Sequence, residues 1–106
     1  MNIGEVWTVD FPFEDDATQS KIRPCLIMDV QDKVYVLSIK ITRHKARDEY
    51  DIPIFKWEEA NLLEPSFARV SKVMLFLKDC FIKKCGKLND TDFNNIKRAF
   101  VKYYRR

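Results

Sequence analysis

The order of residue patterns along the chain limits its fold most strongly: short strand-like runs come first, and a single helical run closes the sequence. Apolar and polar residues alternate in residues 4–11 and 34–41, which is typical of half-buried strands. The apolar run at residues 25–28 predicts a strand buried on both faces. Further strands are expected at 51–54, at 67–77 in long or bent form, and at 81–88 with a β-bulge at Gly86.

The last segment has the helical pattern. Asn89 is a favourable N-cap residue, and Asp90 and Asp92 suit the positive end of the helix. The buried stripe is predicted from helical spacing to contain Phe93, Ile96, Phe100 and Tyr104. Strands followed by one helix in 106 residues predict a single domain, residues 1–106, that is mainly β and forms a small barrel or a tightly curled sheet. Two loops, 13–21 and 43–50, follow strands and are expected to flank a common groove.

Composition narrows the class of protein. A hydrophobic fraction of 46% indicates a packed globule, and no apolar run reaches the roughly 18 residues of a membrane span. The first residues lack the pattern of a signal peptide, so we expect a cytoplasmic protein. The odd number of cysteines indicates reduced thiols, with Cys25 in the core. Because Cys80 and Cys85 are five apart and His44 is distant in the sequence, no zinc site is predicted.

Charge is informative through its distribution. The formal net charge is only +3, but basic residues concentrate in residues 40–47 and 97–106, whereas acids cluster at 14–16. Such basic patches are typical of surfaces that bind polyanions. They are equally typical of a solvated surface and of a helix C-terminus, which favours cations. Charge alone leaves both interpretations open.

Several motifs occur in an order that covers nearly the whole chain. A Gly-Glu-hydrophobic strand opens it, an Arg-Pro dipeptide leads into the second strand, and an Ile-Thr step ends the third. The matching segments are residues 4–10, 23–28, 41–42, 51–54, 57–73 and 86–88. In this order and spacing the chain resembles the MazF/PemK toxins of type II toxin–antitoxin systems.

The resemblance implies an SH3-like barrel with a C-terminal helix, the CcdB/Kid/PemK-like toxin fold, which usually forms a homodimer. It further implies an mRNA interferase, an endoribonuclease that cuts single-stranded RNA at short sequences. The substrate's own 2′-hydroxyl attacks and leaves a cyclic phosphate, with no metal or cofactor. A cognate antitoxin protein is the implied partner.

Three residues are the implied catalytic groups. Arg23 matches the family's catalytic arginine, and its guanidinium fork suits the charge of the phosphate. Thr42 matches a threonine that contacts the scissile phosphate or holds the hydroxyl, and it lies where a strand meets a loop. Arg69 matches an arginine used as a general acid or as a phosphate clamp, and the clamp is chemically easier. Surface or structural roles remain the alternatives for all three.

The chain departs from the family at the proton-transfer positions. Relatives carry Glu where this chain has Thr18, His where it has Ala17, and Asp where it has Ser71. His44 is the first substitute, because histidine transfers protons most readily near neutral pH. The full set of substitutes is His44, Glu14, Asp15, Asp16, Asp48 and Ser71. Slow cleavage, another proton route and no cleavage all remain open.

RNA binding is predicted from one exposed aromatic and a polar track. Phe13 is the candidate for base stacking. The other predicted RNA-binding residues are Thr18, Gln19, Lys21, Arg43 and Lys45. Two alternatives to an RNase remain: a toxin of the same fold that binds a protein, as gyrase poisons do, and a non-catalytic SH3-like module that binds nucleic acid or peptide.

Overall fold

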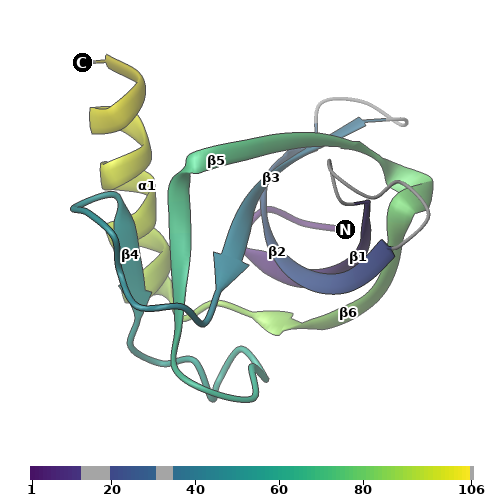
Figure 1. The fold of residues 1–106 in the computed structure, drawn as a ribbon, viewed down its shortest axis with the longest axis horizontal. Coiled ribbons are helices and arrows are strands. Elements are labelled where there is room, and N and C mark those ends of the chain that lie inside the picture. The colour runs from purple at the N-terminus through teal and green to yellow at the C-terminus, as the bar shows by residue number, and fades with distance from the viewer. Residues whose placement is uncertain (13–19, 31–34, 106) are drawn as a thin grey trace.

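The computed structural model describes residues 1–12, 20–30 and 35–105, which form six strands, one short 3-10 helix and one α-helix (Figure 1). The elements in chain order are β1 (Glu5–Pro12), β2 (Ser20–Val30), β3 (Tyr35–Thr42), β4 (Asp51–Ile54), β5 (Ser66–Leu77), η1 (Lys78–Cys80), β6 (Phe81–Lys87) and α1 (Asp90–Arg105). No helix within these ranges is long and apolar enough to cross a bilayer.

The strands form one antiparallel sheet in the order β4-β5-β3-β2-β1-β6. Figure 1 shows that the sheet curls into a ring, with α1 outside it against β4 and β5. The predicted fold class, a small curled β-sheet with a C-terminal helix, is confirmed.

The long strand β5 bends sharply, as Figure 1 shows. Its pairing with β3 changes register between Ile39, which faces Val73, and Lys40, which faces Arg69. The N–H of Val70, which falls within this shift, instead donates to the carbonyl of Tyr50 at 3.0 Å. Before the bend, residues 67–69 of β5 pair with both β3 and β4, and after it residues 73–77 pair with β3.

The predicted irregularity near Gly86 is also present. Val6 pairs with Gly86 but Trp7 pairs with Lys84, so the extra residue is Cys85. A Cβ on Gly86 would lie 2.6 Å from the carbonyl oxygen of Ala60. Glycine at this position therefore lets the turns after β4 pack directly on β6.

Strand β2 is longer than predicted, because it begins at Ser20 and includes the Arg-Pro dipeptide. Pro24 lies opposite Thr8 of β1, whereas pairing with β3 begins only at Cys25. Proline, which has no N–H to donate, thus falls where β2 has a neighbour on one side only. Of the predicted loop 13–21, residues 20 and 21 belong to β2 and the rest lies outside the described residues.

Strand β3 was expected to have one polar face, and this expectation is wrong. Ile39 and Ile41 belong to the main core, but Ser38 and Thr42 of the alternate face are also buried. The curled sheet covers this second face, where the continuous apolar run of β2 also contributes Cys25 and Ile27.

Helix α1 begins as predicted, since Asn89 Oδ1 accepts the N–H of Thr91 at 2.9 Å. Ile96 is buried, and Phe93 and Phe100 are half-buried against the core. The prediction that Tyr104 is buried is wrong, because the last turn of the helix leaves its side chain exposed while its hydroxyl reaches the sheet at the Val70 carbonyl. Asp92, predicted only to suit the helix dipole, is buried and accepts the N–H groups of Phe55 and Lys56 at 3.0 and 2.8 Å. It fixes the helix to the turn that follows β4.

The start of β1 is held by a buried carboxylate. Glu5 accepts hydrogen bonds from the backbone N–H of Asn2 and from Trp7 Nε1, both at 2.9 Å, and pairs with Lys84 Nζ at 2.9 Å. Burial alone would raise the pKa of Glu5, but these donors outweigh it and lower the pKa to about 2. Trp7 itself is half-buried and stacks edge-on against Phe81.

Candidate functional site

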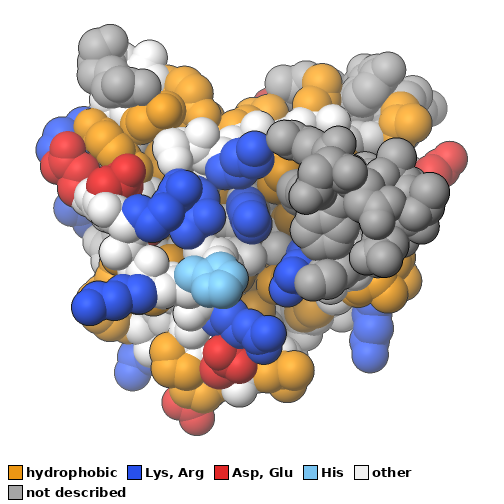
Figure 2. Space-filling view, viewed as in Figure 1, with side chains coloured by type: hydrophobic (Ala, Val, Ile, Leu, Met, Phe, Trp, Pro, Cys, Tyr) orange, Lys and Arg blue, Asp and Glu red, His pale blue; other side chains and the backbone are white. Residues whose placement is uncertain are grey.

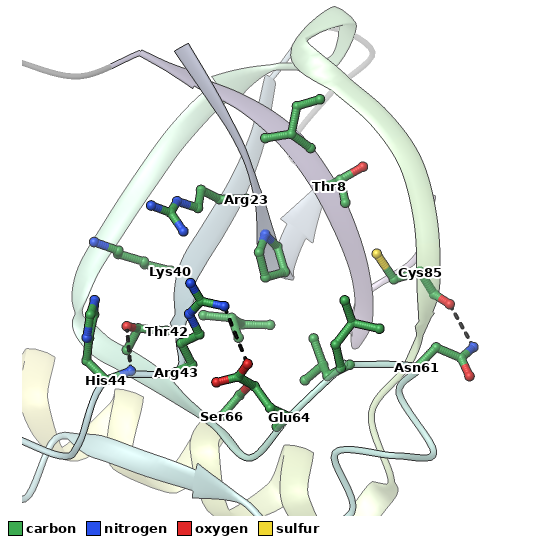
Figure 3. A pocket seen from close by; sticks show the side chains of 15 residues that line it. Thr8, Arg23, Lys40, Thr42, Arg43, His44, Asn61, Glu64, Ser66 and Cys85 are labelled. Atoms are coloured by element: carbon green, nitrogen blue, oxygen red, sulfur yellow. Dashed lines mark hydrogen bonds and ion pairs between the residues drawn. The ribbon is translucent and has the colours of Figure 1, made fainter. Parts of the chain in front are cut away.

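A pocket of about 380 Å³ opens where β2 and β3 meet the turns that follow β4. Its lining combines a cationic and hydroxyl-bearing side with an apolar side (Figure 3). The cationic side contains Arg23, Lys40, Thr42, Arg43 and His44. The apolar side contains Ile22, Pro24, Leu62, Leu63 and Cys85. Figure 2 shows lysine and arginine side chains gathered around the chain's single histidine on this face.

Sheet register places Lys40 and Arg69 side by side in one row of the sheet. Lys40 of β3 pairs with Cys25 of β2 on one side and with Arg69 of β5 on the other, and Arg69 pairs with Asp51 of β4. Directly paired residues share a face of a sheet and lie about 5 Å apart. Arg23 lies two residues before Cys25, so it projects from the same face (Figure 3).

Lys40 is the most crowded of these cations. Lys40 is half-buried, and burial is the largest cause that lowers the pKa of its ammonium. Positive neighbours on β2, β5 and the loop before β4 lower this pKa further. These neighbours are Arg69, Lys72, Arg23 and Arg47. Among the described residues, neither Lys40 nor Arg23 forms an ion pair with a carboxylate. Like charges held together in this way attract an anion.

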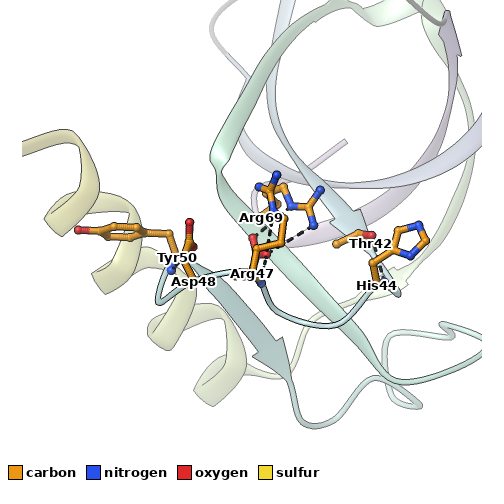
Figure 4. A network of polar contacts seen from close by, with 7 residues as sticks. Thr42, His44, Arg47, Asp48, Tyr50 and Arg69 are labelled. Carbon is orange, nitrogen blue, oxygen red and sulfur yellow. Dashed lines mark hydrogen bonds and ion pairs between the residues drawn. The ribbon is translucent and has the colours of Figure 1, made fainter.

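Asp51 is the carboxylate at the end of the row, and its side chain is fully buried. It accepts from Arg69 Nε at 3.2 Å and Nη2 at 3.5 Å, and from the Arg47 backbone N–H at 2.9 Å (Figure 4). Burial would raise its pKa, but the Arg47 and Arg69 hydrogen bonds lower it overall. Asp51 thus orients Arg69 and anchors residues 43–50, the loop that carries Arg43 and His44.

Thr42 joins that loop to the pocket. Its buried Oγ1 accepts the backbone N–H of His44 at 3.2 Å. Because a hydroxyl accepts and donates at once, the Thr42 proton remains available to a group in the pocket. The imidazole of His44 is exposed on the same wall.

The pocket rim is crossed by an ion pair between Arg43 Nη1 and Glu64 Oε2 at 3.4 Å. Both side chains are at least half exposed, so the pair is weak and opens at little cost. Beside it, Leu63 is 96% exposed and Ile22 is 63% exposed. Apolar side chains presented beside a cluster of cations suit a ligand with both a phosphate and a flat apolar surface.

Comparison with known proteins identifies the family. The model of the PemK-like, MazF-like toxin of type II toxin–antitoxin system matches residues 2–104. The chain belongs to this family. A solved endoribonuclease in complex with its cognate antitoxin, from a mycobacterial species, matches the fold with a TM-score of 0.78 at 13% identity, covering 99% of this chain and 95% of that one. No curated protein matched the sequence.

In this PemK-like chain the structure brings together four of the predicted site residues. Arg23, Thr42, Arg43 and His44 all line the pocket. Arg69 does not line it but lies next to Lys40 in register, with its guanidinium on Asp51.

Three other predicted residues lie away from the pocket. Asp48 is exposed and its Oδ1 accepts the Tyr50 N–H at 2.9 Å, on the helix side of the loop (Figure 4). Ser71, in the register shift of β5, and Lys45, exposed in the loop, do not line the pocket either.

Several predictions fall on parts of the chain outside the description. These are Phe13, Glu14, Asp15, Asp16, Thr18 and Gln19, together with the side chain of Lys21. Among the described residues, no group of three or more His, Cys, Asp or Glu side chains is arranged to hold a metal ion.

Sequence reasoning missed Lys40, Asp51 and Glu64. Lys40 had a detectable signal, because it lies two residues before Thr42 in an alternating strand and must share its face. Asp51 and Glu64 had no such signal in the sequence, because their ion pairs with Arg69 and Arg43 depend on which strands and turns become neighbours in the fold.

Proposed function

We propose that this toxin is an endoribonuclease that cuts single-stranded RNA in the pocket by attack of the 2′-hydroxyl on the adjacent phosphate, without a metal. The observation that carries the proposal is the cluster of Arg23, Lys40 and Arg69 on the face of the sheet that carries Thr42, with no carboxylate pairing Arg23 or Lys40 among the described residues. Family membership supports the reaction type.

Each group has a role in this reaction. Arg23 holds two oxygens of the scissile phosphate in its guanidinium fork, and Thr42 donates a hydrogen bond from its free proton. Arg69, oriented by Asp51, adds positive charge from the adjacent strand, and that charge stabilises the phosphorane-like transition state. His44 accepts the 2′-hydroxyl proton. The base next to the cut lies on the apolar side of the pocket.

Two partners belong to the proposal: a cognate antitoxin, which the related endoribonuclease structure contains, and a second copy of this chain. An antitoxin is expected to protect RNA by covering the pocket. Sedimentation velocity over a range of concentrations tests the homodimer.

The reaction is tested by incubating the purified protein with a long single-stranded RNA, with and without EDTA, and identifying the ends. Fragments with cyclic-phosphate and 5′-hydroxyl ends in both conditions support the proposal. Fragments that disappear with EDTA would indicate a metal-dependent nuclease. RNA bound but left intact by folded protein would favour the non-catalytic binding module, and neither binding nor cleavage would favour a toxin directed at a protein.

A further inference from the structure

We propose that Lys40, a residue outside the family motifs identified in the sequence, is the general acid that protonates the 5′-oxygen leaving group. The inference rests on the proposed cleavage reaction and names its missing proton donor. It follows from where Lys40 lies: in the pocket wall, two residues from Thr42 on the same strand and on the same face as Arg23 (Figure 3).

The chemistry of the lining leaves few alternatives among the described residues. Arginine keeps its proton at any pH at which proteins are folded, so Arg23 and Arg43 hold phosphates but do not donate protons. The ionised carboxylate of Glu64, in its ion pair with Arg43, accepts hydrogen bonds and has no proton to give, and the Cys85 thiol lies across the pocket on its apolar side. Lys40 and His44 are the remaining pocket groups that exchange protons readily.

The surroundings of Lys40 suit an acid better than a structural cation. Among the described residues, the charged and titratable groups that face it are Arg23 and Cys25 from β2, Arg69 and Lys72 from β5, and Arg47 from the loop before β4. Asp51, the nearest carboxylate in the row, is committed to Arg69 and Arg47. Burial and these cations lower the pKa of Lys40, which makes its ammonium a stronger acid than an exposed lysine.

The proton balance closes with these two groups. The 2′-oxygen bonds to phosphorus as its proton passes to the His44 imidazole. The bond between phosphorus and the 5′-oxygen breaks as the Lys40 ammonium gives that oxygen a proton, which leaves a 2′,3′-cyclic phosphate and a 5′-hydroxyl. A proton then returns from the His44 imidazolium to the Lys40 amine through solvent water, and both groups are restored.

The test compares two RNAs that differ only in the leaving atom. One carries the ordinary 5′-oxygen at the cleavage site, and the other carries a bridging 5′-sulfur, which leaves as a thiolate without being protonated. Lys40→Arg keeps the charge but removes the proton donor, and Lys40→Met removes both. Lys78→Met, in η1, is the matched control, and circular dichroism and urea unfolding report whether each variant is folded.

For a general acid, removal of the donor costs about 100-fold or more in rate. Lys40→Arg is therefore expected to lose about 100-fold on the oxygen substrate and to cut the sulfur substrate within a few-fold of the unaltered protein. Lys40→Met, which also removes a positive charge beside the phosphate, is expected to lose more on the oxygen substrate than on the sulfur substrate. Equal losses on both substrates, or no loss on the oxygen substrate, would overturn the inference. Failure of the unaltered protein to cut either RNA would instead overturn the proposed function.

Discussion

Replacing Asp51 with Asn tests how the cationic row is held together. The carboxylate accepts from Arg69 Nε at 3.2 Å and from the Arg47 backbone N–H at 2.9 Å, and its side chain is fully buried. Asparagine has the same shape but only one side-chain oxygen, so its NH₂ group must face the N–H of either Arg69 or Arg47 and cannot accept from it. It also leaves the Arg69 guanidinium, with a side chain only 10% exposed, without its counter-ion.

Breaking a buried ion pair from one side costs about 3 kcal/mol or more, because the remaining charge stays buried and unpaired. With a urea m-value of roughly 1–3 kcal/mol/M, the unfolding midpoint of Asp51→Asn should fall by about 1 M or more. The measurement is urea unfolding at neutral pH, followed by far-UV circular dichroism and by tryptophan fluorescence.

Asp48→Asn is the matched control, three residues earlier in the chain. Asp48 is exposed, and Asn at this position keeps the Oδ1 that accepts the Tyr50 N–H. Its cost should stay within about 0.5 kcal/mol. If Asp51→Asn were no more destabilising than this control, Asp51 would not hold the row, and the account of how Arg69 is oriented would be wrong.

Three further predictions follow from single contacts. Arg23→Ala should lower RNA cleavage by about 100-fold or more in a gel assay while leaving the urea midpoint nearly unchanged, since Arg23 is not in the core; retained cleavage would refute its phosphate role. Folding lowers the pKa of Glu5 from 4.5 to about 2, so its ionised carboxylate contributes up to about 3 kcal/mol to the free energy of unfolding. This contribution is complete above pH 4.5 and is lost as the pH falls toward 2. Glu5→Gln should therefore be less stable than the unaltered protein at pH 7, and its free energy of unfolding should fall less between pH 4.5 and pH 2. Equal losses of stability in the two proteins over this pH range would contradict the prediction. Gly86→Ala places a Cβ 2.6 Å from the Ala60 carbonyl oxygen and should cost about 1–3 kcal/mol, whereas Lys87→Ala, exposed beside it, should cost less than about 0.5 kcal/mol.

Local patterns were sufficient to predict the six strands and the terminal helix of the described residues, but not the short 3-10 helix η1. Alternation placed strands at residues 4–11 and 34–41, and Asn89 marked the start of the helix, all close to the observed bounds. What alternation did not predict was burial on the second face of β3, because that depends on the sheet curling over itself. The true start of β2 was missed because Pro24 was expected to precede a strand, and the strand accommodates it where β3 no longer pairs.

The candidate site was predictable where residues are close in sequence. Thr42, Arg43 and His44 lie together because they are neighbours at the end of one strand. Arg23 joins them only through the pairing of β2 with β3. The resemblance implied that Arg23 and Thr42 act in one site, whereas periodicity did not.

The carboxylates show the limit of sequence reasoning most clearly. Asp48 was a candidate for proton transfer, yet the structure turns it toward Tyr50 and places Asp51, three residues later, in the row of cations. Asp51 reaches the cations, and Asp48 does not, because of the pairing between β4 and β5, which joins residues far apart in the sequence.

The most direct test of the central claim, that the substrate's own 2′-hydroxyl is the nucleophile in this pocket, uses one short RNA in two forms. The first is all ribose, and the second has a single 2′-deoxyribose at the nucleotide 5′ to the cut. We expect the protein to bind both forms with similar affinity and to cut only the first, because the second lacks the attacking oxygen. Cleavage of both forms at the same position and rate would contradict the account.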